Sequence, residues 1–420
     1  MIRRIKIQGY KSLQNVELSL QPLTVVFGPN AAGKSNLFDA LGLLSRLTTS
    51  KTLRDAFDPK VHRGVPLEAF NYGAAGLEGL LAAPEARFTI EADIELSDAA
   101  VNAAQTRVRQ MREGLPDDRG GNGKRSPQVV IQRLLRYRVT IELVPTTGVL
   151  RVADEYLTAL NPDGTETQRR QPFIEKVGNR LRLRMEKQAH PTENEVGLDY
   201  TLVSSQLYPP HYPHITAFRE EVSRWHFYYL EPDRMRADAP IQEISILDRT
   251  GEDLAAFYHT LRLQAPKRFD SLQRALRLLL PNVDSLDVRP TSSGLLELDI
   301  QMGNAPYSSR LVSEGTLRIL GLLAITRPLV PVSVIGYEEP ENGVHPRRLQ
   351  LIADLLVNAS RDTGVQFLIN THSPLLPDYL KLKATLVACT QADTGTHFEL
   401  VGPLFAEDIV QRILQGDFGG

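Results

Sequence analysis

The sequence predicts an α/β protein that combines a mixed β core, an antiparallel β lobe and an α-helical lobe. Within the first 50 residues, an apolar strand, a glycine-containing loop and an amphipathic helix follow one another. From about residue 87 to 157, apolar and polar residues alternate, which is the pattern of half-buried strands. From about residue 225 onward, apolar helices and strands take turns along the chain, as they do in α/β folds.

Composition excludes several classes of protein. Of the 420 residues, 42% are hydrophobic and 23% are charged, which excludes a disordered or fibrous chain. No apolar run reaches the roughly 18 residues of a membrane-spanning helix, and the first residues, MIRRIKIQGY, contain no signal-peptide core. We therefore expect a cytoplasmic protein with no membrane partner. Cys389 is the only cysteine, which excludes disulfides within the chain, and its VACT setting predicts a buried strand thiol.

The first elements are three strands and a helix. The segments IRRIKIQGY and LQNVELSL alternate like half-buried strands, whereas LTVVFG is apolar throughout and predicts a buried strand. A helix is expected from Lys34, because its leucines share one face. These leucines are Leu37, Leu41, Leu44 and Leu47.

The middle of the chain predicts an inserted, β-rich and locally basic lobe over residues 61–219. Its strand candidates are RFTIEADIEL, RYRVTIELV, VLRVADEYL and NRLRLRME. Between the first two, EGLPDDRGGNGKRSPQ is rich in glycine, proline and charge and predicts a mobile loop. The flanking segments, 1–60 and 220–420, would then form one discontinuous domain.

The last part of the chain returns to alternating helices and strands. Two helices are expected between 251 and 281, broken near Pro266, and another from Pro346 to Ala359. The segment SEGTLRILGLLAI predicts a further helix. The strand candidates are WHFYYLEP, VDSLDVRP, LLELDI, PVSVIGYEEP and VQFLINTHS.

The segment GPNAAGKS, residues 28–35, fits the phosphate-binding pattern G-x-x-x-x-G-K-[ST] and lies between a predicted strand and a predicted helix. Gly28 and Gly33 permit the tight backbone path that wraps phosphates, and the helix N-terminus adds its positive dipole. Lys34 would reach the β- and γ-phosphates of a nucleotide, and the Ser35 hydroxyl would bind Mg²⁺. The alternative is a glycine-rich turn that binds nothing.

A pair of carboxylates ends the apolar strand VSVIGYEE. Glu338 is expected to hold Mg²⁺, and Glu339 to orient or deprotonate an attacking water. The usual first residue is Asp; Glu lengthens the reach by roughly 1.5 Å, one C–C bond. The alternative is a solvent-exposed acidic turn. The segments PENGVHP and INTHS follow, and His372 in the second could hydrogen-bond a γ-phosphate, although a lone histidine is more often structural.

Together these segments resemble the ABC-type ATPase heads, in particular the branch of SMC proteins, RecF-like repair ATPases and the ATPase part of OLD-family nucleases. The resemblance covers the first 50 and last 110 residues and implies ATP and Mg²⁺ as cofactors. It also implies that Asn30 and Asn36 bind the cofactor. The segment IQGYKSL looks like the NFRS segment of that branch, which suggests Lys11 near the nucleotide. No glutamine can be assigned to the family's Q-loop.

The segment RLVSEGTLRIL resembles the ABC signature, which closes the ATP held by a second head. The resemblance therefore implies that Ser313, Gly315 and Thr316 contribute to a partner's site, and that a homodimer encloses two ATP molecules. Glycine allows close backbone approach, the two hydroxyls can donate, and the helix dipole favours a phosphate. From the residues alone, SEGT could equally be a helix cap.

The sequence indicates the target of such a head less specifically than it indicates the nucleotide site. Residues 101–190 hold 17 Lys and Arg against 10 Asp and Glu, which favours DNA as a target in a setting such as phage defence or DNA repair, with a separate effector. The arginines expected to line phosphates are Arg133, Arg136, Arg138, Arg182 and Arg184. The alternative is a regulator of a protein partner without DNA; a transporter subunit fits less well. A nuclease is not expected, since the segment after His372 is short and its carboxylates are few beyond Glu407 and Asp408.

Overall fold

The computed structural model describes residues 1–58, 62–73, 75–113, 129–186, 190–392 and 395–402. The chain forms two compact units, each of which is discontinuous in sequence. The first comprises Met1–Gln21, Ser35–Trp225 and Gln391–Phe398, and the second comprises the remaining segments, 22–34, 226–390 and 399 onward. The division of the sequence into domains at residues 60 and 220 stays a prediction, and the predicted loop lies outside the described residues from 114 to 128.

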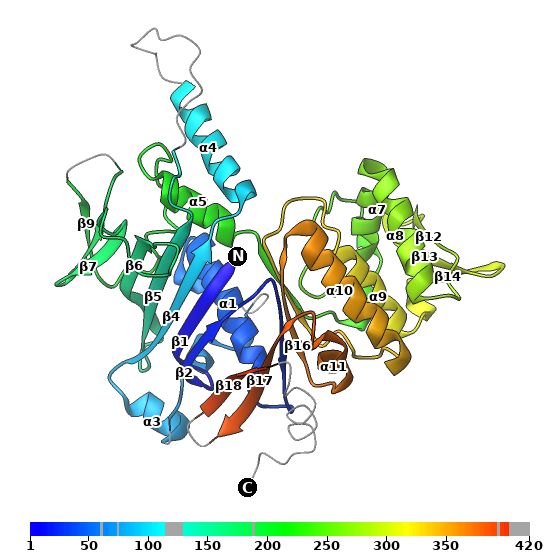
Figure 1. Cartoon of the computed structure of the whole chain (residues 1–420), viewed down its shortest axis with the longest axis horizontal. Coiled ribbons are helices and arrows are strands. Elements are labelled where there is room, and N and C mark those ends of the chain that lie inside the picture. The colour runs from blue at the N-terminus through cyan, green and yellow to red at the C-terminus, as the bar shows by residue number, and fades with distance from the viewer. Residues whose placement is uncertain (59–61, 74, 114–128, 187–189, 393–394, 403–420) are drawn as a thin grey trace. The chain divides into compact units, whose positions relative to one another are not determined.

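The first unit is built on an eight-stranded antiparallel sheet in the order β2-β1-β4-β5-β6-β7-β8-β9. Figure 1 shows these strands in blue to green. Their bounds are β1 Ile2–Tyr10, β2 Leu13–Ser19, β4 Ala86–Glu95, β5 Leu134–Val144, β6 Val149–Ala159, β7 Ile174–Val177, β8 Arg180–Leu183 and β9 Thr192–Glu195.

The register of β1 explains why the first strands share a sheet with the middle of the chain. Ile5 pairs with Leu18 of β2 on one side and with Ala92 of β4 on the other. Ile5 and Ile7 are fully buried, so the alternation seen in the sequence places one face of the sheet in the core. The antiparallel β lobe that the sequence predicts is therefore confirmed, and it includes the N-terminal strands.

Helices of the first unit include one that the sequence analysis did not find. They are α1 Lys34–Thr49, α2 Leu53–Ala56, η1 Pro66–Ala69, α3 Gly76–Ala82, α4 Asp98–Glu113 and α5 Pro213–Val222. Helix α4 buries Ala100, Val101, Ala104 and Val108, a stripe of small apolar residues at helical spacing. Such a narrow stripe gives a weak periodic signal, and strand patterns flank it on both sides.

The second unit contains most of a six-stranded sheet, whose strand order is β10-β15-β16-β3-β17-β18. Strands β15, β16, β3 and β17 are parallel to one another. The bounds are β3 Leu23–Phe27, β10 Trp225–Tyr228, β15 Val334–Glu338, β16 Gln366–Thr371, β17 Thr385–Ala392 and β18 Gly395–Val401. Cys389 is a free, buried thiol, as its setting predicts.

A smaller antiparallel sheet and most of the helices complete the second unit. The sheet has the order β11-β13-β12, with β14 paired to β13. Its strands are β11 Ala239–Pro240, β12 Ser285–Pro290, β13 Leu295–Met302 and β14 Ala305–Ser308. The helices are α6 Pro232–Met235, α7 Leu254–Gln264, α8 Pro266–Leu279, η2 Ser309–Leu311, α9 Glu314–Ile325, η3 Pro346–Arg348, α10 Leu349–Thr363 and α11 Leu375–Leu380.

The mixed sheet and the helical part of this unit confirm the predicted α/β class. In Figure 1, α7, α8 and α9 gather beside β12, β13 and β14. Apolar side chains of α7, α8, α9, β12 and β13 form one core with those of β3, β15 and β16. Among the described residues, no helix is long and apolar enough to cross a membrane.

Candidate nucleotide site

The parallel strands of the second unit bring three of the predicted motifs to one edge of the sheet. Glu338, the last residue of β15, pairs with Asn370 of β16, and Thr371 of β16 pairs with Phe27 of β3. Because parallel strands end at the same edge, the loop after β3, the carboxylates after β15 and His372 after β16 are neighbours. Ligands of open α/β sheets bind at such an edge.

The loop after β3 is tightly closed. Gly28 has no space for a side chain, since an added Cβ would lie 2.1 Å from the backbone oxygen of Cys389. Ala31 and Gly33 have left-handed backbone, with φ of 64° and 104°. Such conformations direct successive N–H groups toward one side, which is how backbone concavities bind anions. The loop therefore fits a phosphate group.

Lys34 folds back over this loop. Its Nζ donates hydrogen bonds to the carbonyl oxygens of Gly28 at 2.8 Å and Pro29 at 2.7 Å. Burial lowers the pKa of its ammonium group, while the carboxylates of Glu339, Glu341 and Glu338 oppose the shift. A partly desolvated ammonium group attracts an anion such as phosphate, because the anion favours its charged form.

The two carboxylates after β15 differ in environment. Glu338 is 4% exposed, and its Oε2 accepts a hydrogen bond from Nδ2 of Asn370 at 3.1 Å. Glu339 has left-handed backbone with φ of 50°. Its N–H donates to the carbonyl of Asn370 at 3.0 Å, with Oδ1 of the same residue at 3.2 Å. The burial of Glu338 excludes the alternative of a solvent-exposed acidic turn.

Asn342 and Asn370 support Glu339 and were not found from the sequence. Asn342 Nδ2 donates to Glu339 Oε2 at 2.5 Å. The amide group of Asn370 bonds the carboxylate of Glu338 and the backbone N–H of Glu339. Left-handed backbone at a residue other than glycine costs free energy, and it persists where the surroundings determine it. Asn342 therefore holds the carboxylate of Glu339, and Asn370 holds its backbone.

His372 lies between two carboxylates without bonding closely to either. Its Nδ1 is 3.6 Å from Glu339 Oε1 and 3.4 Å from Glu341 Oε1. The side chain is 36% exposed, so its other ring nitrogen can meet a ligand. The turn that carries His372 is fixed by Glu341, whose Oε1 accepts hydrogen bonds from Thr371 Oγ1 and from the N–H groups of His372 and Ser373.

The predicted signature turn opens α9 and packs against the segment after the carboxylates. Ser313 is the N-cap, because its Oγ accepts from the N–H of Thr316 at 3.3 Å. The two hydroxyls also lie 2.9 Å apart, so one of them donates to the other and one hydroxyl proton stays available. An added Cβ on Gly315 would lie 2.1 Å from the carbonyl oxygen of Gly343. The cap is thus observed, and it leaves the trans role open.

Two family models match the chain. One, described as "AAA domain, putative AbiEii toxin, Type IV TA system", matches residues 208–378, and the other, described as "AAA ATPase domain", matches residues 1–112. A solved SMC head bound to the C-winged helix domain of ScpA has the same fold, with a TM-score of 0.54 and 12% identity over 97% of this chain and 99% of that one. Together these matches support an ABC-type, SMC- and OLD-like ATPase.

Two further relatives agree with this assignment. The ABC-type fold recurs in an SMC head with an extended coiled coil, bound to the C-terminal domain of ScpA derived from Pyrococcus furiosus. It has a TM-score of 0.51 and 12% identity over 98% of this chain and 99% of that one. An OLD nuclease of Thermus scotoductus is 36% identical over 44 residues, which are 10% of this chain and 8% of that protein. The chain therefore matches less than a tenth of the nuclease's length.

In the first unit, Lys11 belongs to a buried polar cluster. Its Nζ donates to Asp39 Oδ2 at 2.5 Å and to the carbonyl of Arg63 at 3.1 Å. Asp39 also accepts from the Tyr10 hydroxyl at 2.6 Å. Burial alone would raise the pKa of Asp39, but Lys11 and His62 together hold it below its ordinary value. The sequence analysis did not find Asp39, although it lies on the predicted helix.

The remaining predicted ligands lie along the loop and the first turn of α1. Asn30 is exposed in the loop, and Ser35 directly follows Lys34. Asn36 Nδ2 donates to Ser12 Oγ at 2.8 Å. In the part of the chain that the structure describes, no group of three or more His, Cys, Asp or Glu could hold a metal alone. Mg²⁺ that arrives with phosphates needs only one or two protein oxygens, and Ser35 and Glu338 are hard oxygen donors of that kind.

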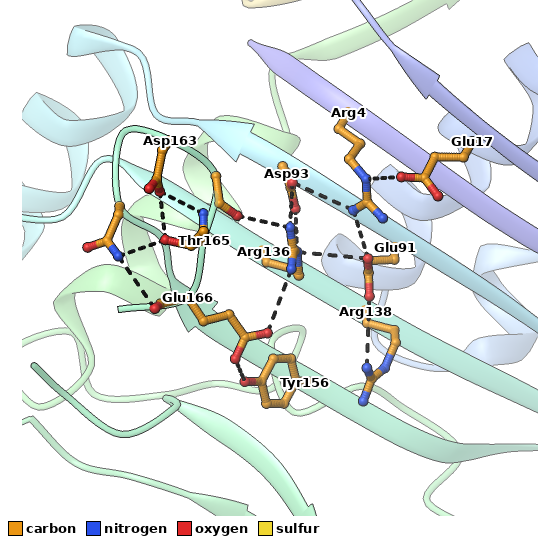
Figure 2. A network of polar contacts seen from close by, with 12 residues as sticks. Arg4, Glu17, Glu91, Asp93, Arg136, Arg138, Tyr156, Asp163, Thr165 and Glu166 are labelled. Atoms are coloured by element: carbon orange, nitrogen blue, oxygen red, sulfur yellow. Dashed lines mark hydrogen bonds and ion pairs between the residues drawn. The ribbon is translucent and has the colours of Figure 1, made fainter. Parts of the chain in front are cut away.

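The arginines predicted to line DNA phosphates are each paired with a carboxylate. Figure 2 shows Arg136 against Asp93, with Nε and Nη2 donating at 2.7 and 2.8 Å. Arg138 donates to Asp154 at 3.0 Å. The other three pairs are Arg133 with Asp98, Arg182 with Glu193, and Arg184 with Glu175. The excess of basic residues in the sequence is therefore not a row of free cations on these strands.

Proposed function

We propose that this protein binds and hydrolyses ATP, and that two copies close head to tail around two ATP molecules to act as a switch. The observation that supports the site is the group of Lys34, Glu338, Glu339 and His372 at one edge of a parallel sheet, beside a loop closed by Gly28. A phosphate-binding lysine next to two differently held carboxylates suits phosphoryl transfer to water.

Each residue has a role in this proposal. Lys34 binds the β- and γ-phosphates, together with N–H groups of the loop that includes Asn30 and Gly33. Ser35 and Glu338 would hold Mg²⁺, which neutralises charge on the phosphates. Glu339 orients the attacking water, and His372 donates a hydrogen bond to the γ-phosphate. The resemblance adds Lys11 and Asn36 to the residues proposed to contact the nucleotide.

The proposed dimer follows from the signature turn. Ser313 and Glu314 are exposed at the start of α9, where the helix dipole is positive. A second copy can therefore present its own Ser313, Gly315 and Thr316 to the ATP of the first copy. Twofold symmetry requires that the first copy does the same for the ATP of the second. Each chain then supplies part of two sites.

We propose that the target of this switch is a protein rather than DNA. The five arginines that favoured DNA are neutralised by carboxylates, and two structural relatives of the same fold are bound to a protein, ScpA. DNA as target, with a separate effector in phage defence or repair, is the second candidate and rests on the net charge of residues 101–190 and on resemblance.

The solution mass of Glu339→Gln tests the switch. Without its water-orienting carboxylate, the variant should bind ATP and hardly hydrolyse it, so Mg-ATP should convert monomer to a lasting dimer. Light scattering after gel filtration measures the mass, with and without Mg-ATP. Glu339→Gln combined with Ser313→Arg should stay monomeric, because the arginine obstructs the partner's phosphate.

Lys34→Ala serves as the control, since it should lose ATP binding in an equilibrium assay with a fluorescent ATP analogue. Retained affinity in this variant would contradict the assigned phosphate site. A mass that ATP does not change, in a sample that is monomeric without nucleotide, would show that SEGT is only a helix cap.

A further inference from the structure

In the described part of the second unit, six side chains bury polar atoms that have no hydrogen-bond partner, and three of these side chains supply four such atoms within the predicted motifs. These atoms are Nε and Nη1 of Arg318, the hydroxyl oxygen of Tyr337, and Oε2 of Glu341. The three residues are 9%, 0% and 7% exposed. Buried polar groups are nearly always paired, and an unpaired buried charge is especially costly, so each such atom calls for an explanation.

The three side chains share one neighbourhood. Arg318 lies three residues after Gly315 on α9, which places both on one face of the helix. That face meets the segment after Glu341, because an added Cβ on Gly315 would contact Gly343 and Val344. Burial raises the pKa of the Tyr337 hydroxyl, while the charge of Arg318 opposes this shift and the charge of Glu341 adds to it. A cation and an anion thus both act on Tyr337, from two segments that pack against each other.

Glu341 divides its two oxygens between different tasks. Oε1 accepts from Thr371 Oγ1 at 2.6 Å, from the N–H of His372 at 3.0 Å and from the N–H of Ser373 at 3.2 Å. This oxygen therefore fixes the turn that carries His372. Oε2 has no partner, and it is the acceptor that an approaching guanidinium group would need.

We propose that Glu341 is a positioning residue that couples the signature helix to His372 through Arg318. The inference rests on the proposed function. When a partner's ATP draws the start of α9 toward it, the guanidinium group of Arg318 moves onto Glu341 Oε2, and Tyr337 accompanies it. The paired carboxylate then holds the His372 turn rigidly, which places the imidazole for the γ-phosphate in the chain's own site.

This contact makes the two sites of a dimer dependent on each other. The signature turn of one chain touches the ATP of its partner, whereas His372 of the same chain serves its own ATP. Occupation of one site is thereby transmitted within a single chain to the other, over residues that belong to one unit. Hydrolysis should then be cooperative in ATP, because both sites must fill before either histidine is held.

A double-mutant cycle between Arg318 and Glu341 tests the coupling. The variants are Arg318→Met, Glu341→Gln and both together, with Arg361→Met at an exposed position of α10 as the control. Steady-state hydrolysis gives kcat, KM and the Hill coefficient, and a fluorescent ATP analogue gives the affinity of the single chain. Thermal unfolding of each variant shows whether it folds.

Each single variant should lower kcat by about 10- to 100-fold, the size of a small misplacement of a catalytic group, and bring the Hill coefficient to 1. ATP affinity of the single chain should change by less than about 3-fold. The double variant should be no slower than the slower single one, because both remove the same contact. Arg318→Lys, which keeps the charge, should recover part of the loss.

Effects that multiply in the double variant would overturn the inference, and so would wild-type kcat and cooperativity in Arg318→Met. If Arg318→Met does not fold, the same cycle with Arg318→Lys decides between these outcomes. Failure of the proposed function looks different, because the wild-type protein would then bind no ATP, or would hydrolyse it as a monomer.

Discussion

At the scale of single residues, one amide group organises the carboxylates of the site. Asn370 donates from Nδ2 to Glu338, while its carbonyl and Oδ1 receive the N–H of Glu339. A residue that holds two neighbours at once controls their relative position. In the proposed reaction that position matters, because one carboxylate serves Mg²⁺ and the other serves water.

Replacement of Asn370 should therefore slow hydrolysis more than it weakens binding. We expect Asn370→Ala to lower kcat by about 10- to 100-fold, since small displacements of reacting groups have effects of this size. KM should change by less than about 3-fold, because Lys34 and the phosphate loop are untouched. Asn358→Ala, at an exposed position of α10, is the matched control. Equal losses in the affinity for ATP and in kcat would show that Asn370 supports the loop as well.

Sequence could predict the residues whose role depends on a local pattern. Lys34 and Ser35 belong to a loop with fixed spacing, and Glu338, Glu339 and His372 each end an apolar strand. The position of Asn370 beside the carboxylates depends on the register between β15 and β16. Glu341 accepts a hydrogen bond from the N–H of His372, in the turn after β16. Asn370 and Glu341 both lie inside segments that carry the motifs. The pairing register between two strands, however, cannot be predicted from the sequence of either strand alone.

At the scale of elements, the phosphate loop is built against a neighbouring strand. Gly28 follows β3 and faces the carbonyl oxygen of Cys389 in β17, which leaves no room for a methyl group. The close approach is between two backbones, so a flexible side chain cannot relieve it. The parallel pairing of β3 with β17 and the shape of the loop are therefore linked.

Gly28→Ala should destabilise the fold and the loop together. We expect a loss of about 1–3 kcal/mol in the free energy of unfolding, the usual cost of overpacking a tight site, measured by urea titration. ATP affinity should fall in parallel, by at least 10-fold. Gly148→Ala is a useful comparison, because its added Cβ meets open space and only the left-handed backbone, with φ of 68°, opposes it. Unchanged ATP affinity in Gly28→Ala would show that ATP binding by the loop does not depend on this packing.

The elements themselves were predicted where their pattern is strong. The break between α7 and α8 falls at Pro266, and the strands of both sheets carry the expected alternation or apolar runs. Helix α4 was missed because alanine and valine form its buried stripe. Short strands such as β7 and β9 were missed because four residues are too few to show an alternating pattern. Their place in the sheet depends on pairing with β8.

At the scale of the whole molecule, net charge proved a poor guide to where cations are available. The excess of Lys and Arg between 101 and 190 favours a polyanion, yet the arginines on β5 and β8 lie opposite carboxylates on neighbouring strands. Opposite charges that face each other across a sheet stabilise it and cancel its field. Part of the basic region, residues 114–128, lies outside what the structure describes.

This pairing leads to a prediction about DNA. Binding to phosphates releases counterions in proportion to the free cations that contact them, so a face of paired arginines should give almost no salt dependence. We expect the full chain to show a slope near zero for log K against log salt, measured by fluorescence anisotropy with a duplex, with and without Mg-ATP. Arg136→Gln should leave this slope unchanged while lowering thermal stability, because Asp93 loses its bidentate partner and is almost fully buried. A steep slope that Arg136→Gln reduces would instead make these strands a DNA surface. A steep slope that Arg136→Gln does not reduce would place DNA on another basic part of the chain. That result would favour DNA over a protein as the target of the switch.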